Sequence, residues 1–213
     1  MESHEPVLTG LVPDPRRAGS VQLCVDGKPL LTVAAAVVRE EGLVEGMALT
    51  DPLHARLCRA ADVEAALRAA LRALARRPYA MEELCRRLVH RGHPPEASEE
   101  AVARAASLGL LDDQEFAETY VRIRRERGHG PARLRRDLLV RGVDPSLVER
   151  AMRVDAPPEE RESEMLRELA SRRVGQVRGL PRRTQIRRLT AYLARRGYTG
   201  AQVGKVVREV LQP

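Results

Sequence analysis

One nine-residue pattern occurs three times in this sequence. Leu-x-x-x-Leu-x-x-Arg-Gly occupies residues 84–92, 134–142 and 189–197. Its glycines lie 50 and 55 residues apart, a period typical of proteins built from tandem structural repeats. We therefore predict that the last two thirds of the chain is one structural unit used three times.

Each copy of the pattern predicts the end of an amphipathic helix. Leucines four residues apart lie on one helix face, the arginine favours the negative helix end, and glycine can adopt the positive φ needed just beyond it. Apolar segments precede and follow each copy. Turn residues separate these segments from the pattern. Before the three copies the turns lie at Arg77-Pro78, residues 128–131 and residues 179–181. After the copies they lie at residues 93–95, Asp144-Pro145 and Thr199-Gly200. Each copy is thus predicted to contain three helices.

The first 58 residues carry a different pattern. Short β-prone runs lie at residues 7–11, 21–25 and 29–33, and Asp26-Gly27 is a hairpin-turn signal between the last two. A helix is expected over residues 34–41 and a further strand over residues 47–50.

The predicted fold class is mainly α, with three tandem three-helix repeats in an elongated array and a small N-terminal β-containing extension. The predicted domains are the extension (1–58), repeat 1 (59–111), repeat 2 (112–160) and repeat 3 (161–213).

Charge is unevenly distributed along the chain. Residues 1–58 carry a net charge of −3 and residues 59–213 carry +10, of which residues 161–213 supply +9. No Asp or Glu occurs from Ser171 to Val207. Uncompensated positive charge repels itself unless an anionic partner balances it, so we expect a partner-binding face here. An ordinary solvated helix face is the alternative.

The segment from Arg182 to Arg196 indicates where that charge points. At 100° per residue, its apolar side chains share one side, while Arg187, Arg188 and Arg195 cluster on the other. The candidate partner-binding electrostatic face comprises Arg183, Arg187, Arg188, Arg195, Arg122, Arg125 and Arg136.

No catalytic motif is present in the sequence. It contains no Gly-x-x-x-x-Gly-Lys-[Ser/Thr], no His-Glu-x-x-His and no Gly-x-Ser-x-Gly, and its five histidines fall at unrelated spacings. Asp112 and Asp113 form a carboxylate pair, but Asp112 followed by Glu115 is the pattern of a helix N-cap. We therefore predict helix capping rather than metal binding at this pair, and neither an enzyme nor a cofactor.

Cysteine usage and hydropathy bear on the compartment. The three cysteines are odd in number and lack metal-ligand spacing, which favours a reducing compartment and leads us to expect a cytoplasmic protein. The longest apolar run, around residues 30–38, is too short to cross a membrane. The sequence shows no sustained heptad pattern, so a monomer is expected.

Four stretches resemble a known family. They are residues 77–84 (Arg-Pro-Tyr-Ala-Met-Glu-Glu-Leu), residues 110–117 (Leu-Leu-Asp-Asp-Gln-Glu-Phe-Ala), residues 128–131 (Gly-His-Gly-Pro) and residues 141–143 (Arg-Gly-Val). With their spacing they resemble the RecX family, and the resemblance covers roughly residues 61–210. It implies three tandem three-helix repeats and a role as a bacterial modulator of the RecA recombinase.

Two functions from different classes remain open. The resemblance implies a regulator that binds the RecA filament and modulates, most simply by inhibiting, its ATPase, strand-exchange and coprotease activities in recombination and DNA repair. The alternative is a direct nucleic-acid-binding protein or transcription factor of helical type, because each predicted unit joins helices by tight turns and the repeats are basic overall. Single-stranded or double-stranded DNA is a possible partner under either function.

Overall fold

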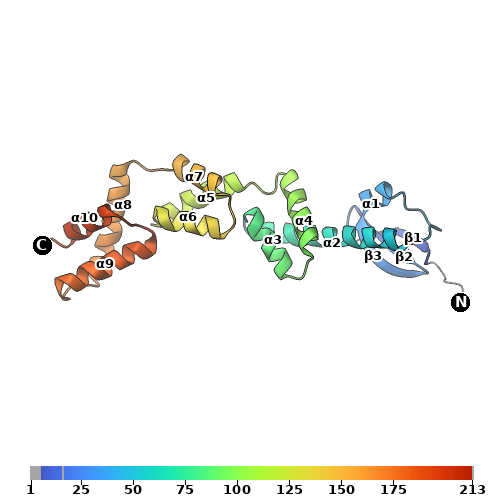
Figure 1. Ribbon diagram of the computed structural model, residues 1–213, viewed down its shortest axis with the longest axis horizontal. Helices are drawn as coiled ribbons and strands as arrows, with labels where there is room; N and C mark the ends of the chain where they lie inside the picture. Colours follow the sequence, from blue (N-terminus) through green and yellow to red (C-terminus); the bar gives the residue numbers. More distant parts are fainter. Residues whose placement is uncertain (1–5, 16, 213) are drawn as a thin grey trace. The chain divides into compact units, whose positions relative to one another are not determined.

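The computed structural model describes residues 6–15 and 17–212, and Figure 1 shows their secondary structure. Within those ranges lie ten helices and one three-stranded sheet. The predicted mainly α class, with a small N-terminal sheet, is confirmed. The chain divides into two compact units, one of residues 1–79 and 83–111 and one of residues 80–82 and 112–213. No helix in the described ranges is both long enough and apolar enough to cross a membrane.

The first unit begins with an antiparallel sheet in the order β1 (Leu8–Pro13), β2 (Ser20–Val25) and β3 (Lys28–Ala34). The predicted turn joins β2 and β3, with Asp26 and Gly27 both at positive φ. The predicted fourth strand over residues 47–50 is reduced to a single bridge between Val7 and Ala48. Since α2 begins at Asp51, the chain leaves the sheet edge after that one bridge.

Two helices follow the sheet, α1 (Ala35–Glu40) and the long α2 (Asp51–Leu74). The first part of α2 buries Leu53 and Leu57 in a core with the strands, whereas its later part belongs to repeat 1. The predicted limit between residues 58 and 59 therefore falls within one continuous helix.

Repeat 1 consists of α2, α3 (Met81–His90) and α4 (Pro95–Ser107). Its α2 packs against α4, and both helices bury mainly alanines, among them Ala66 and Ala70 on α2 and Ala101 and Ala105 on α4. Small side chains let two helix axes approach closely, so this repeat needs few large apolar residues.

The second unit contains two further three-helix bundles. Repeat 2 is α5 (Asp113–Glu126), α6 (Pro131–Val140) and α7 (Pro145–Val154), and repeat 3 is α8 (Glu159–Val174), α9 (Arg182–Arg196) and α10 (Ala201–Val210). Each bundle has its own apolar cluster, centred on Leu134 and Leu138 in repeat 2 and on Leu189 and Leu193 in repeat 3.

The three helix ends predicted from the repeated pattern are confirmed. Gly92, Gly142 and Gly197 have φ of 90°, 85° and 95°. In each copy the next backbone N–H donates to the carbonyl of the second leucine, from His93 to Leu88 (3.2 Å), from Val143 to Leu138 (3.2 Å) and from Tyr198 to Leu193 (3.0 Å). All six repeated leucines are buried. A bond of this span closes the helix and satisfies a carbonyl that would otherwise lack a partner.

Candidate functional site

Four of the seven candidate arginines lie on α9. Arg183, Arg187, Arg188 and Arg195 are exposed, while Leu189 and Leu193 on the opposite side are buried. An amphipathic helix packed by one face leaves its polar residues to the solvent, so this placement follows from the local sequence.

Two of these four arginines line a cleft of about 320 Å³, and the other two do not. Arg188 and Arg195, with Ala191 between them, lie on one strip of α9 and line the cleft. Residues at i, i+3 and i+7 share a helix face, which explains their grouping. Arg183 and Arg187 are outside the lining and lie on the adjoining strip of the same helix.

The other wall of the cleft comes from the end of α8 and the turn after it. Arg173, Gln176 and the buried Val177 complete the lining. The guanidinium carbon of Arg173 lies 5.3 Å from the ring centroid of Tyr192, a cation–π contact that holds this half-buried side chain in place. Arg173 and Gln176 were missed as candidates because only the packing of α8 on α9 brings them to the same place.

Positive charge in this cleft is not balanced internally. Its six lining residues include three arginines and no acid, and in the part of the chain that the structure describes none of the three has an ion pair. Exposed arginines elsewhere do find carboxylates, as Arg56 does with Glu41 (2.8 Å) and Arg135 with Glu149 (2.7 Å). The repeat 3 cleft is therefore a concentration of unpaired guanidinium groups.

Arg122 and Arg125 line a second, larger cavity of about 750 Å³ between α5 and α8. There the charges are interleaved with four acids, and Arg125 is ion-paired to Asp155 at 2.8 Å with only 11% of its side chain exposed. Arg125 thus serves an internal contact. The remaining candidate, Arg136 on α6, is 67% exposed and lies 3.7 Å from Asp137. The structure brings Arg188 and Arg195 together and places Arg122, Arg125 and Arg136 elsewhere.

Repeats 2 and 3 meet through backbone atoms close to the cleft. The N–H of Gly130 donates to the carbonyl of Arg196 at 2.7 Å, and the N–H of Ala132 donates to the carbonyl of Gly197 at 3.1 Å. A Cβ on Gly197 would lie 2.5 Å from the backbone nitrogen of Arg133, so no larger residue fits there without movement. The Gly-His-Gly-Pro turn of repeat 2 is therefore the docking point for the end of α9.

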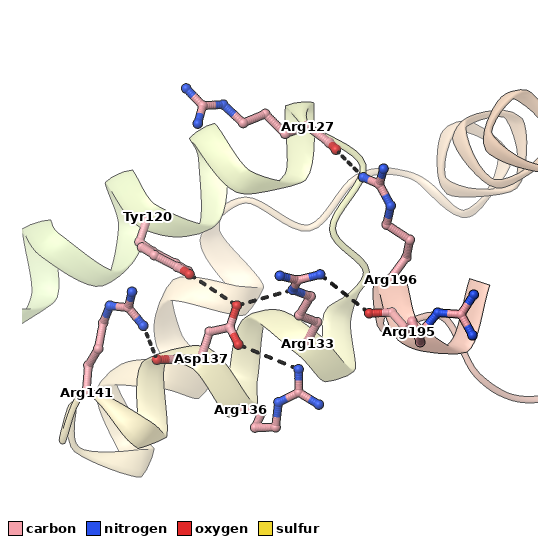
Figure 2. Close-up of polar contacts among 8 residues, drawn as sticks. All are labelled: Tyr120, Arg127, Arg133, Arg136, Asp137, Arg141, Arg195 and Arg196. Atoms are coloured by element: carbon pink, nitrogen blue, oxygen red, sulfur yellow. Dashed lines mark hydrogen bonds and ion pairs between the residues drawn. The ribbon is translucent and has the colours of Figure 1, made fainter. Parts of the chain in front are cut away.

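Arginine side chains reinforce this junction, as Figure 2 shows. Arg196 donates to the carbonyl of Arg127 at 2.9 Å, and Arg133 reaches both the carboxylate of Asp137 (3.4 Å) and the carbonyl of Arg195 (3.5 Å). These hydrogen bonds fix the C-terminal end of α9, and with it the backbone that carries Arg195.

The carboxylate pair Asp112 and Asp113 caps two helices. Asp112 accepts hydrogen bonds from the N–H groups of Gln114 and Glu115, which confirms the predicted N-cap of α5. Asp113 accepts from the N–H of Met81 at 2.8 Å and so caps α3 from 32 residues away. Burial raises the pKa of Asp113 above its ordinary value, and the Met81 hydrogen bond only partly offsets this. Among the described residues, no group of three His, Cys, Asp or Glu side chains could hold a metal ion.

Comparison with known proteins gives a consistent result along the helical part. Family models for the first, second and third three-helix domains of RecX match residues 66–104, 112–152 and 159–207. The chain is 38% identical over 152 residues to regulatory protein RecX of Streptomyces coelicolor, covering 70% of this chain and 79% of that protein. It is also 38% identical over 143 residues to regulatory protein RecX of Halorhodospira halophila, covering 66% of this chain and 84% of that protein.

Solved structures show the same fold. A crystal structure of regulatory protein RecX matches 96% of this chain and 99% of its own with a TM-score of 0.76 at 22% identity. The crystal structure of RecX from Lactobacillus salivarius matches 70% of this chain and 96% of its own with a TM-score of 0.58 at 20% identity.

Proposed function

Because this chain belongs to the RecX family, we propose that it is a regulatory protein that binds the RecA recombinase filament in the cytoplasm and inhibits it. The observation that supports this proposal most strongly is the match of all three RecX three-helix domains, in order, between residues 66 and 207. The activities that it would suppress are ATP hydrolysis, strand exchange and coprotease action in recombination and DNA repair. The proposed role is that of a regulator and not of an enzyme.

Three successive modules suit a target that is itself repetitive. A filament presents the same surface on each protomer, so a chain with several modules can contact more than one protomer at once. Once one module is bound, the others are held at a high effective concentration, and affinity for the filament exceeds affinity for a free protomer. The proposal therefore requires recognition of assembled recombinase.

The test is ATP hydrolysis by RecA on single-stranded DNA, with this protein added below equimolar amounts to filaments formed beforehand. We expect hydrolysis to fall by more than the fraction of protomers titrated, because one bound chain contacts several of them. Reversing the order of addition is the control, since a regulator of the filament acts in either order.

Direct nucleic-acid binding is the second candidate function, and the unpaired arginines of the repeat 3 cleft favour it. A transcription factor is less well supported, because the third helix of repeat 1 exposes Glu96, Glu99 and Glu100 where a recognition helix would present neutral or basic groups to DNA. If preformed filaments resist the protein fully, and inhibition requires amounts near those of the DNA sites, direct DNA binding replaces filament regulation as the function.

A further inference from the structure

The cleft of repeat 3 is lined by hydrogen-bond donors from two elements of the chain. Arg173 and Gln176 approach from the end of α8 and the following turn, and Arg188 and Arg195 approach from α9. Val177 and Ala191 are the apolar residues of its lining. Guanidinium groups are planar forks that match the paired oxygens of a phosphate or carboxylate. The donor set of the cleft, three guanidinium groups and one amide, thus suits an oxyanion.

The electrostatics of the surroundings strengthen this conclusion. From Leu169 to Arg208 the sequence contains no acid, so Arg188 and Arg195 lie far along the chain from any carboxylate, and for Arg173 the nearest one along the chain is Glu168, which pairs with Arg172. The larger cavity beside Arg122 differs, because its arginines are interleaved with acids and include the Arg125–Asp155 pair. An anion in the small cleft would relieve the repulsion among its three arginines, none of which shares in the ion pairs that Glu168 and Glu209 form with Arg172 and Arg167. The larger cavity does not lack negative charge in this way, because four acids line it.

Repeat 3 also lacks the apolar anchors of a protein interface. Every large apolar side chain that the structure shows as exposed lies at or before Val154, including Leu108, Leu139 and Val140 in repeats 1 and 2. Cores of protein–protein interfaces are apolar and poor in charge, whereas protein–DNA interfaces are polar and strongly positive. The exposed surface of repeat 3 is of the second type.

We propose that the cleft formed by Arg173, Gln176, Arg188 and Arg195 binds a backbone phosphate of DNA, which makes repeat 3 the DNA-contacting part of this protein. Recognition is of the backbone and independent of sequence, because Tyr192 is half-buried and its ring is contacted by Arg173 and Arg196 instead of being available to stack on bases. The proposal concerns DNA alone and stands whether or not the chain regulates a recombinase.

The test compares two double variants of the full chain by fluorescence anisotropy with a labelled thymidine oligonucleotide and no recombinase. Arg188→Gln with Arg195→Gln removes two charges from the cleft. Arg183→Gln with Arg187→Gln removes two charges from the same helix outside it and is the matched control. We expect the cleft variant to bind about tenfold more weakly or worse, and the control to change by less than about threefold.

Salt dependence and a charge-conserving variant give two further readouts. Removing one phosphate interaction flattens the slope of log K against log salt by about 0.7 for single-stranded DNA. Arg188→Lys with Arg195→Lys keeps the charge but loses the fork, so its affinity should fall between those of wild type and the Gln variant. All these side chains are exposed, and unchanged melting by circular dichroism establishes that each variant is folded.

Three outcomes would overturn the proposal. Equal losses in the two Gln variants would mean a diffuse basic face with no specific cleft. Full affinity in the Lys variant would refute the forked recognition from which the phosphate site is argued, because positive charge alone would then be sufficient. DNA affinity unchanged in the Gln variant, with inhibition of RecA lost, would assign the cleft to carboxylates on a protein partner and would leave the regulatory function standing.

Discussion

At the residue scale, the glycines of the repeated pattern share a conformation but not an environment. Gly142 and Gly197 both have positive φ, of 85° and 95°. A Cβ at Gly142 would meet nothing within 4 Å, whereas at Gly197 it would lie 2.4 Å from the Cβ of Arg133. The same residue in the same motif is needed for its backbone angle in one repeat, and for both angle and space in another.

This difference predicts unequal costs for one substitution. Gly142→Ala should lower the free energy of unfolding by about 1–2 kcal/mol, the cost of a left-handed conformation with a Cβ. Gly197→Ala should cost about 1–3 kcal/mol more, because the junction between repeats 2 and 3 must also shift. Urea unfolding of both variants measures the two values, and equal losses would contradict the close contact at Gly197.

His129 lies within the turn that docks repeat 2 on repeat 3, and its surroundings predict that stability depends on pH. Burial lowers the pKa of its imidazole below the ordinary value, and the positive charges of Arg133, Arg124 and Arg196 lower it further, against a smaller opposite effect of Asp137. The unfolded chain then binds a proton at a pH where the folded chain does not. Stability from the neutral form is complete above about pH 6.5 and is lost as pH falls toward the lower folded pKa.

Removing this imidazole should therefore flatten part of the acid dependence. His129→Gln is expected to show a smaller fall in melting temperature than wild type between about pH 7 and pH 5, because its side chain does not titrate. Melting by circular dichroism at a series of pH values measures the difference. Parallel curves for the two proteins would show that His129 does not couple to folding.

At the element scale, α2 serves two cores in succession. Leu57 near its start is buried with the N-terminal sheet, and Ala66 and Ala70 further along are buried against α4. A helix of 24 residues makes this possible, because at 1.5 Å per residue its two parts are far enough apart to join separate clusters. The N-terminal sheet and repeat 1 are therefore tied by a continuous element.

The face of α6 that carries Leu134 and Leu138 lies at the centre of the repeat 2 core. Leu138→Ala should lower the free energy of unfolding by about 2–5 kcal/mol, because it opens a cavity at the centre of repeat 2 where Leu138 is fully buried. Arg136→Ala, two residues away and 67% exposed, should change it by less than about 0.5 kcal/mol. Chemical unfolding of both variants tests the assignment, which equal stabilities would refute.

At the scale of the whole molecule, charge is segregated along the chain. The net charge of +7 is the sum of a mildly acidic extension, two nearly balanced repeats and a strongly basic third repeat. Repeats 1 and 2 instead expose large apolar side chains such as Leu110 and Val140. We therefore expect protein contacts mainly through the first two repeats and polyanion contacts through the third.

Charge reversal on α9 tests this division. Replacing Arg188 and Arg195 by Glu should weaken binding to DNA-bearing RecA filaments and make the remaining affinity less dependent on salt, while the melting temperature stays close to that of wild type. Anisotropy or sedimentation at low salt provides the measurement. Undiminished filament affinity would reduce this face to an ordinary solvated surface.

Features that depend on neighbouring residues could be predicted from the sequence. The period of the repeat, the six buried leucines, the glycine at each helix end, the hairpin at Asp26-Gly27 and the N-cap at Asp112 all follow from local patterns. Helix periodicity and turn chemistry act over a few residues, so neighbouring residue types suffice to predict them. The exposure of the arginines on α9 could likewise be predicted from a local pattern.

Only the tertiary structure decided which residues these side chains lie beside. It set Arg173 beside Arg188 and Arg195, paired Arg125 with Asp155, and placed Gly197 against the backbone of Arg133. Each of these contacts joins residues 15 or more positions apart, and a charge is free or neutralised only according to what packing brings within a few ångströms of it. Such distances are set by how helices pack and not by any local pattern, and for that reason the cleft could not be predicted from the sequence.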